Sequence, residues 1–215
     1  MLILQVCNRQ RHIGEIMQPV NERLNNIVFA CLARTRKAML LDNEITVSYS
    51  SDESKVPSTG KAIHAMWEQA KAGKCTFVVY SGANDASNLF FSPLVNLLYR
   101  TVHDFDHAIN YSVNRGTTKY EDELYLNCLM AKRVYDWTMC SDYYTEQDAL
   151  MVFFAMLHDT VGQVKYYKEH SDFVVDQRQN TVDLLNNCKG YKAAAAGQLN
   201  VAYQVMRACL KECGV

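Results

Sequence analysis

The sequence predicts a mainly α-helical protein, a single-domain helical bundle with at most a small two-stranded β ribbon in its N-terminal third. Three observations support this fold class. Only 3 prolines and 9 glycines occur in 215 residues, so few positions interrupt a helix. Apolar residues recur every three or four positions over much of the chain. A chain of this length commonly forms one domain and buries a core without disulfides.

The N-terminal elements follow from local patterns. Residues 20–41 are expected to form a helix, because Val20 and the apolar residues that follow it at helical spacing share one side, opposite a charged face. The runs EITVSYS (44–50) and CTFVVYSG (75–82) have the composition of short strands and would pair as the ribbon. Between them, a polar loop leads to a short helix over 60–73, capped by Ser58 or Thr59 and ended by Gly73.

From Ser92 the chain is expected to be helical almost to its end. Four helices are predicted over 92–115, 118–139, 145–170 and 176–190, followed by a C-terminal helix over 191–213. Gly116 would end the first helix and Gly190 the fourth. Thr118, with Glu121 three residues later, predicts a capping box for the second helix, and Thr145 would begin the third.

The predicted helices divide one domain, 1–215, into three parts. These are an N-terminal subregion 1–90, a motif-bearing core 91–190 and the C-terminal helix 191–213. No internal repeat is evident. Whether the chain forms a homo-oligomer is left open.

Composition excludes several classes of function. The net charge is −1 and the basic residues are scattered, so neither nucleic acid nor an acidic membrane surface is an expected partner. The apolar run at the N-terminus is too short for a signal peptide, and none approaches the length of a membrane span. The 8 cysteines form no CxxC pair, which argues against a structural zinc site. These features predict a cytoplasmic protein with free thiols.

The stretch HDFDH, residues 103–107, carries an unusual density of titratable groups. Its helix has an apolar stripe of Leu94, Leu98, Val102, Phe105 and Ile109. At about 100° per residue, His103, Asp104 and His107 share one sector of the polar side. Imidazole and carboxylate groups bind first-row divalent metals, so this sector is a candidate metal site. The alternative is a polar helix edge with a partly solvated histidine pair. Asp106 lies nearer the apolar edge and is expected to be solvated or hydrogen-bonded.

A second polar stripe follows the apolar run ALMVFFAML. Asp159, Gln163, Tyr166 and His170 are four, three and four residues apart. Asp159 is expected to enter the interior, where a carboxylate needs a cation or hydrogen-bond donors. A metal shared with the His103 helix would supply that cation; a hydrogen bond to a neighbouring helix, or a solvated helix end, is the alternative. Gly162 inside this helix predicts close packing against another element.

Isolated residues complete the candidate site. His64 could be a further ligand, although a single helix histidine is more often a packing or surface residue. Arg100 and Lys165 could steady a phosphate, and Glu123 is a free carboxylate at the start of the next helix. The candidate metal ligands are thus His64, His103, Asp104, His107 and Asp159, and the candidate catalytic residues are Arg100, Glu123, Gln163 and His170.

The order His64, His103–Asp104, Asp159 resembles the HD superfamily of metal-dependent phosphohydrolases. This resemblance implies a helical fold that holds one or two divalent metals and hydrolyses phosphate esters, such as nucleotides. A second register is also open, with His103 or His107 first, His158–Asp159 as the pair, and Asp176 or Asp183 last. HDFDHAIN is similar to the HDxDH motif of cyclic-nucleotide phosphodiesterases but lacks the glycine that follows there.

A longer pattern over about residues 90–180 resembles a group of uncharacterised bacteriophage proteins. It consists of HDxxH, an acidic helix start, DxxGQxxYY, a histidine and FxxDQ. The resemblance implies a phage origin, and hence the host cytoplasm, without implying an activity. It also implies that one set of residues acts together: Asp104, His107, Asp159, Gln163, His170 and Asp176.

Three functional hypotheses follow. The first is a metal-dependent helical hydrolase that uses a divalent metal to cleave a phosphoester. The second is a non-enzymatic phage protein, either a virion component or a host-takeover protein that binds a host partner, in which the His/Asp cluster is a structural polar network. The third, a di-iron carboxylate bundle, ranks last because the sequence lacks paired Glu-x-x-His motifs.

Overall fold

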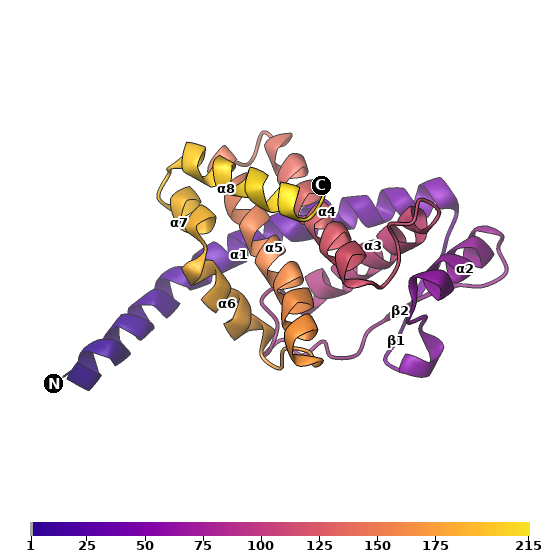
Figure 1. The fold of residues 1–215 in the computed structure, drawn as a ribbon, viewed down its shortest axis with the longest axis horizontal. Coiled ribbons are helices and arrows are strands. Elements are labelled where there is room, and N and C mark those ends of the chain that lie inside the picture. The colour runs from indigo at the N-terminus through magenta and orange to yellow at the C-terminus, as the bar shows by residue number, and fades with distance from the viewer. Residues whose placement is uncertain (1) are drawn as a thin grey trace.

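The computed structural model describes the backbone of residues 2–215 and the side chains from residue 22 onward. Within that range it contains eight α-helices and one two-stranded sheet, so the mainly α prediction is confirmed (Figure 1). The elements are α1 (Leu2–Asn43), β1 (Val47–Ser50), η1 (a 3₁₀ turn, Glu53–Lys55), α2 (Gly60–Lys71), β2 (Phe77–Tyr80), α3 (Pro93–Tyr111), α4 (Tyr120–Met139), α5 (Glu146–His170), α6 (Gln177–Asn187), α7 (Lys189–Ala195) and α8 (Leu199–Glu212).

Helix α1 is longer than the pattern predicted, because it begins at Leu2 instead of residue 20. It packs against α3, α4 and α5. The predicted apolar side of this helix is buried from Leu24 to Leu32. Val20, assigned to the same side, lies outside the residues whose side chains are described. The long helix therefore provides a surface on which three later helices assemble.

The predicted ribbon is present, and its two strands are parallel. Val47 pairs with Phe77 and Ser50 with Tyr80. Parallel strands need a crossover connection, and here α2 supplies it. Of the two residues predicted to cap α2, Thr59 does so: its side chain accepts a hydrogen bond from the Ala62 N–H.

Helix α3 begins as predicted, with the Ser92 side chain capping the Val95 N–H. Its apolar stripe is shifted from the predicted one. Leu94 and Ile109 are exposed, by 56% and 45%, and Val95 and Ala108 are buried in their place. The buried apolar residues repeat every three or four positions: Val95, Leu98, Val102, Phe105 and Ala108. Leu94 and Ile109 each lie one position beyond the ends of this series.

The start of α4 differs from the prediction. The capping box of Thr118 and Glu121 is wrong, because α4 begins at Tyr120 and no side chain caps it. Instead, the Asp122 carboxylate accepts hydrogen bonds from the backbone N–H and hydroxyl of Thr117. The predicted start of α5 is correct, and Thr145 forms a capping box with Asp148.

The C-terminal region also departs from the prediction. Residues 191–213 do not form one helix; they are divided between α7 and α8. Gly197, at φ +71°, adopts the left-handed conformation at this break, where glycine carries no steric cost. Gly190 does not end a helix, because it lies inside α7. Its position against the Phe154 ring leaves no room for a larger residue.

The interior has two apolar clusters. The main core gathers residues from α1, α3, α4, α5 and the C-terminal helices. The small core lies where α2 and β2 meet the second half of α3, around Trp67, Phe77 and Phe105. Helix α3 contributes to both, with Val102 in the main core and Phe105 in the small one.

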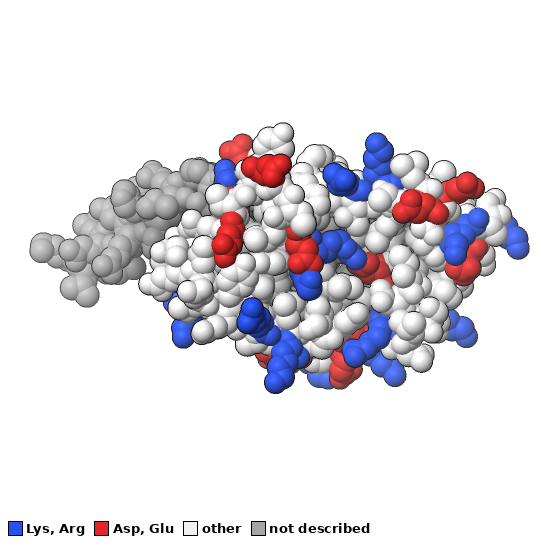
Figure 2. Space-filling model, turned by 90° about the horizontal axis from the view of Figure 1, so that it is seen from above, with Lys and Arg blue, Asp and Glu red and all other residues white. Residues whose placement is uncertain are grey.

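The surface carries charge of both signs. On the face shown in Figure 2, basic and acidic side chains are interspersed, without a large area of one sign. Among the described helices, none combines the length and apolar character needed to cross a bilayer.

Candidate metal centre

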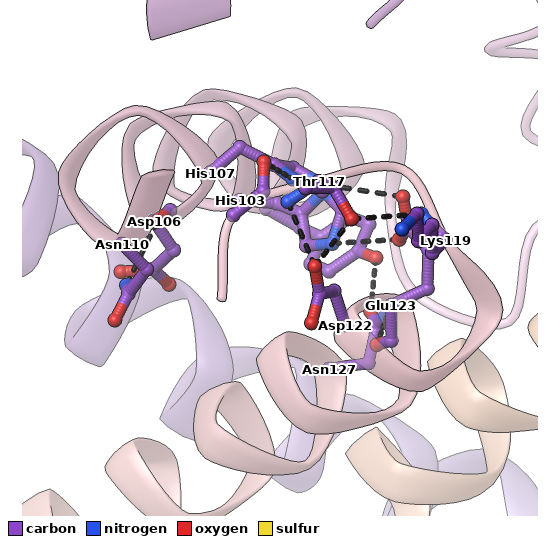
Figure 3. A network of polar contacts seen from close by, with 11 residues as sticks. His103, Asp106, His107, Asn110, Thr117, Lys119, Asp122, Glu123 and Asn127 are labelled. Atoms are coloured by element: carbon purple, nitrogen blue, oxygen red, sulfur yellow. Dashed lines mark hydrogen bonds and ion pairs between the residues drawn. The ribbon is translucent and has the colours of Figure 1, made fainter. Parts of the chain in front are cut away.

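Two helices bring three potential metal ligands together. His103 and His107 lie one turn apart on α3, and Glu123 is in the first turn of α4 (Figure 3). His103 Nε2 is 3.4 Å from Glu123 Oε2, and His107 Nε2 is 3.2 Å from Glu123 Oε1. One ligand atom from each residue fits in a group whose members all lie within 4.8 Å of one another. Within the described part of the chain, this is the one such group of His, Cys, Asp and Glu residues.

These separations suit a first-row metal. Bonds of about 2.0–2.1 Å in a tetrahedron place neighbouring ligand atoms roughly 3.3 Å apart. His103 Nε2 and His107 Nε2 lie 3.4 and 3.2 Å from different oxygens of Glu123, so each of these separations, taken singly, is close to that edge. Two histidines and one carboxylate also form a ligand set that metalloenzymes use, in which further coordination positions stay open.

The surroundings of His107 fix the direction of its ring. The side chain is 2% exposed, and its Nδ1–H donates to the backbone carbonyl of Gly116 at 3.1 Å. A carbonyl can only accept, so Nδ1 carries the proton and Nε2 faces Glu123. Metal-binding histidines are commonly oriented in this way by a second hydrogen bond. A Cβ at Gly116 would lie 2.1 Å from the His107 carbonyl oxygen, so glycine permits this approach.

His103 has a buried nitrogen without a hydrogen-bond partner. Its ring stacks on Tyr99 with centroids 5.3 Å apart and meets the His107 ring edge-on at 4.6 Å. The 3.4 Å approach to Glu123 is within ion-pair distance, yet His103 Nε2 lacks a partner with hydrogen-bond geometry. Leaving such an atom unpaired is unfavourable by about 1–3 kcal/mol. A metal ion bound to His103 Nε2 would provide the missing partner, so these residues fit a metal site.

The two histidines and Glu123 also influence one another's charge. Burial opposes the charged form of Glu123, but its close approach to His103 and His107 outweighs this effect, so the pKa of Glu123 lies well below its usual range. Burial likewise opposes the charged form of His107, and the interaction with Glu123 reverses the effect, so the pKa of His107 is raised. In the absence of metal, the charged forms of Glu123 and His107 therefore stabilise each other.

The remaining acids of HDFDH face different neighbours. Asp104 lies near the cluster but outside the group of three; burial is the main reason that its pKa rises to about 6. Asp106 is 3% exposed and accepts two hydrogen bonds of 2.7 Å from the Arg133 guanidinium of α4. The expectation that Asp106 is hydrogen-bonded is confirmed, and the alternative of a solvated side chain is wrong.

Asp159 enters the interior as predicted, but it meets a hydrogen-bond donor instead of the histidine cluster. The Thr181 hydroxyl donates to its carboxylate at 3.1 Å. Burial raises the pKa of Asp159 to about 7. Asp159 and Tyr99 both line a cavity of about 10 Å³, and the Tyr99 ring also stacks on His103. One residue of each polar stripe, Asp159 and His103, therefore lies near Tyr99.

Two other candidates are engaged elsewhere. His64 Nδ1 is 2.8 Å from the Ala108 carbonyl oxygen, and its ring stacks on Tyr111 at the far end of α3, so it does not join His103 and His107. The Arg100 guanidinium donates to the carbonyls of the loop after β2, from Tyr80 to Ala83. Its donors therefore hold that loop in place, and the structure gives no support to a phosphate role for Arg100.

The candidates on α5 make local hydrogen bonds. The Gln163 side-chain amide donates to the Asp159 carbonyl one turn earlier. His170 is exposed and bonds through Nδ1 to the Tyr166 carbonyl. Asp176 caps α6, and the exposed Asp183 accepts from Gln179. The residues of both HD registers and of the phage-type pattern are thus dispersed, apart from His103, Asp104 and His107.

Glu123 lies with the candidate metal ligands His103 and His107. The sequence identified it as a free carboxylate suited to catalysis, and the structure places it as the carboxylate member of the candidate ligand set. Its position in a new helix soon after Gly116, where the chain reverses, is the one signal that could have indicated this. No protein-family model, curated protein or solved structure matches the chain.

Proposed function

We propose that the protein binds one divalent transition metal through His103, His107 and Glu123 and acts as a metal-dependent hydrolase. The observation that carries this proposal is the convergence of three ligand atoms within 4.8 Å, one of them a buried nitrogen without a hydrogen-bond partner. A set of three protein ligands is typical of catalytic sites, whereas structural zinc sites use four.

The residues around the centre have separable tasks in this proposal. The bound metal would activate water and polarise a substrate oxygen. Gly116 orients His107 through its carbonyl, and Tyr99 packs on His103 and donates a hydrogen bond to Asn127. Asn127 in turn donates to the Glu123 carbonyl and so links the carboxylate-bearing turn of α4 to α3. These contacts hold the ligands in place before a metal binds.

The substrate expected from the HD resemblance is a phosphoester such as a nucleotide. Because Arg100 is committed to backbone carbonyls, charge on such a substrate would be neutralised chiefly by the metal. Phage origin, host cytoplasm and a host or virion partner remain predictions from the sequence.

Metal content tests the proposal directly. Protein expressed with added zinc, manganese or iron should contain about one ion per chain. Glu123→Gln and His107→Gln should each lose most of it, because every ligand of a three-ligand set is needed. Asp136→Asn, which alters an exposed carboxylate on the same helix, is the matched control and should retain the metal. Absence of metal under every supply would contradict the proposal.

Activity tests the second half of the proposal. The metal-loaded protein should hydrolyse a member of a panel of nucleotides and nitrophenyl phosphate esters, and Glu123→Gln should remove that activity along with the metal. A protein that holds the metal but cleaves nothing in the panel would limit the function to metal binding.

A structural role for the same cluster is the second candidate. The observation that favours it is the neighbouring Asp106–Arg133 pair, which already joins α3 to α4 by side-chain charges. In that case His103 and His107 would pair with Glu123 only to fix how the two helices meet. Glu123→Gln would then lower the melting temperature of a protein that never takes up metal.

A further inference from the structure

The two strands of the ribbon have different outer edges. In a parallel pair, the backbone groups of alternate residues face the partner strand, and those of the residues between them face outward. The Phe77 N–H donates to the Thr46 carbonyl, and the Ser81 N–H donates to the Ser50 carbonyl. The outward-facing residues that follow from this register are Val47 and Tyr49 on β1 and Val78 and Tyr80 on β2.

The outer edge of β2 is covered by its neighbours. The Val78 N–H donates to Met66 Sδ of α2 at 3.3 Å. The Tyr80 carbonyl accepts a hydrogen bond from the Arg100 guanidinium of α3 at 3.2 Å. Side chains of two helices thus occupy backbone groups to which a further strand would have to pair, so β2 is protected against strand addition.

The outer edge of β1 is open. Among the residues that the structure describes, none forms a hydrogen bond with the outward backbone groups of Val47 or Tyr49. Ser48 and Tyr49 are exposed, and Val47 is half-buried. The strand contains no lysine or proline and its register has no bulge, so the usual devices that block pairing at an edge are missing from β1. β1 therefore presents two N–H groups and two carbonyls to an added strand.

The two faces of β1 differ in chemistry. Tyr49 lies on the face toward α3, where its hydroxyl is 3.1 Å from the Thr101 hydroxyl, and the residue remains 40% exposed. Val47 packs against the small core on the same face. Ser48 and Ser50 lie on the opposite face. An added strand would therefore place β-branched side chains of one face beside Tyr49 and polar side chains of the other beside the serines.

The segments that flank β1 are acidic. The exposed acids of residues 42–55 are Asp42, Glu44, Asp52 and Glu53. Lys55 is the one basic residue of this range, and it pairs with Asp52 at 3.3 Å. These charges oppose a second copy of the chain, because an antiparallel pair of β1 strands centred on Ser48 would place Glu44 of one chain opposite Asp52 of the other. Basic residues at the ends of an added strand would meet opposite charge instead.

We propose that β1 is a docking edge for an extended segment of a partner protein, which adds to the ribbon as a third strand and carries basic residues at its ends. Hydrogen bonds to the outward backbone groups of Val47 and Tyr49 hold the segment in place. The acids that flank β1 select the charge of its ends. This edge shares no residue with the metal centre, so the proposal is independent of the proposed function.

The partner side is tested on the unmodified full chain with a synthetic peptide, KKTVTVTKK with blocked ends, which has an alternating centre and basic ends. Titration by heteronuclear NMR, with peptide up to roughly 2 mM, should give saturable shifts in β1. At saturation, the amides of Val47 and Tyr49 should exchange with solvent at least about tenfold more slowly. The amides of Ser48 and Ser50, which face β2 already, should change little.

Two further peptides are the controls. One is the same sequence with N-methyl groups on its central residues, which cannot donate from its backbone, and the other is EETVTVTEE, whose ends are acidic. Each should bind about tenfold or more weakly than KKTVTVTKK. Equal binding by either control, or no saturable shift with KKTVTVTKK, would overturn the proposal. Protection of the same amides that rises with the concentration of the free chain would overturn it too, because the occupant would then be a second copy.

The protein side is tested with Tyr49→Pro, which removes one outward N–H. A strand tolerates proline where the N–H faces away from its sheet. Tyr49→Ala is the matched control, because both variants lack the ring and only proline lacks the N–H. Tyr49→Pro should bind KKTVTVTKK about tenfold more weakly than Tyr49→Ala, and equal affinities would contradict the proposal. If Tyr49→Pro does not fold, the comparison of the three peptides still decides.

Discussion

At the scale of single residues, two aspartates of the same helix show how local neighbours decide what a charge does. Asp106 faces Arg133 across the α3–α4 contact and is almost fully buried. Asp104, two positions earlier, lies near the histidine cluster, and burial raises its pKa to about 6. An aspartate therefore joins two helices at position 106, and another lies beside a candidate metal site at position 104.

The Asp106–Arg133 pair should be essential to stability. In Asp106→Asn the guanidinium loses its counter-charge in a largely buried site, and the free energy of unfolding should fall by about 3 kcal/mol or more. Asp136→Asn on α4 is the control. Asp136 is 51% exposed and its partner Lys132 39%, so the loss should be under about 1 kcal/mol. Urea denaturation of both variants makes the comparison, and equal losses would show that burial of the pair contributes little.

Asp159 predicts a pH dependence whose sign can be stated. The unfolded chain releases this proton near pH 3.9, whereas the pKa in the folded protein is about 7. Between these values the folded state binds more protons, so the free energy of unfolding falls as pH rises. Asp159→Asn removes the effect. The free energy of unfolding of the variant should be about equal to that of wild type at pH 4 and larger by about 2–4 kcal/mol at pH 8.

Denaturation with a chelator present, at several pH values, measures this difference. Asp183→Asn, on the exposed side of α6, is the control. Its free energy of unfolding should differ from that of wild type by a nearly constant amount over the same pH range. An Asp159→Asn curve parallel to wild type would contradict the assignment of a buried, protonated carboxyl group.

At the scale of elements, α7 is fixed by contact with α5. A Cβ at Gly190 would lie 2.2 Å from Phe154 Cζ, and the Phe154 ring is fully buried, so neither partner can move freely. Gly190→Ala should reduce the free energy of unfolding by about 3 kcal/mol. Gly73→Ala is the comparison, because its φ of +68° is unfavourable for alanine but nothing lies within 4 Å. In Gly73→Ala the free energy of unfolding should fall by only about 1 kcal/mol. Chemical denaturation of the two variants measures the difference.

The helices were predictable from the sequence because their buried faces repeat at local spacing. The ends were predictable where one side chain decides, as at Ser92 and Thr145. The Thr118–Glu121 box was wrong because the same residues suit a loop, and Asp122 secures Thr117 instead. The break between α7 and α8 depends on packing against distant helices, and so does the direction of the two strands.

The candidate site was also predictable from the sequence only in part. The shared sector of His103 and His107 follows from the geometry of one helix, and the sequence predicted it. The position of Glu123 depends on how the chain turns at Gly116 and how α4 packs on α3, which involves residues far apart in the chain. Arg100 was assigned from its helical spacing and His64 also from its place in the HD-like order, and their tertiary partners proved to be backbone carbonyls.

At the scale of the whole molecule, a metal that joins α3 to α4 should raise the melting temperature. Binding only the folded state adds about 2.7 kcal/mol when the free metal is at 100 times its Kd. For a chain of this size that corresponds to roughly 5–10 °C. Calorimetry with and without zinc should show the shift in wild type and lose it in Glu123→Gln. An equal shift in that variant would place the metal elsewhere.

The contribution of α3 to both apolar clusters has a consequence for how the protein unfolds. Phe105 and Ala108 belong to the small core, and Val95, Leu98 and Val102 of the same helix belong to the main one. Opening either cluster exposes one half of a continuous hydrogen-bonded helix, so the two should lose their protection together. Amides of β2 and α5 should then exchange with solvent at a common limiting rate, as parts of one cooperative unit. Much faster exchange in β2 would instead identify the α2–ribbon region as a separately opening unit.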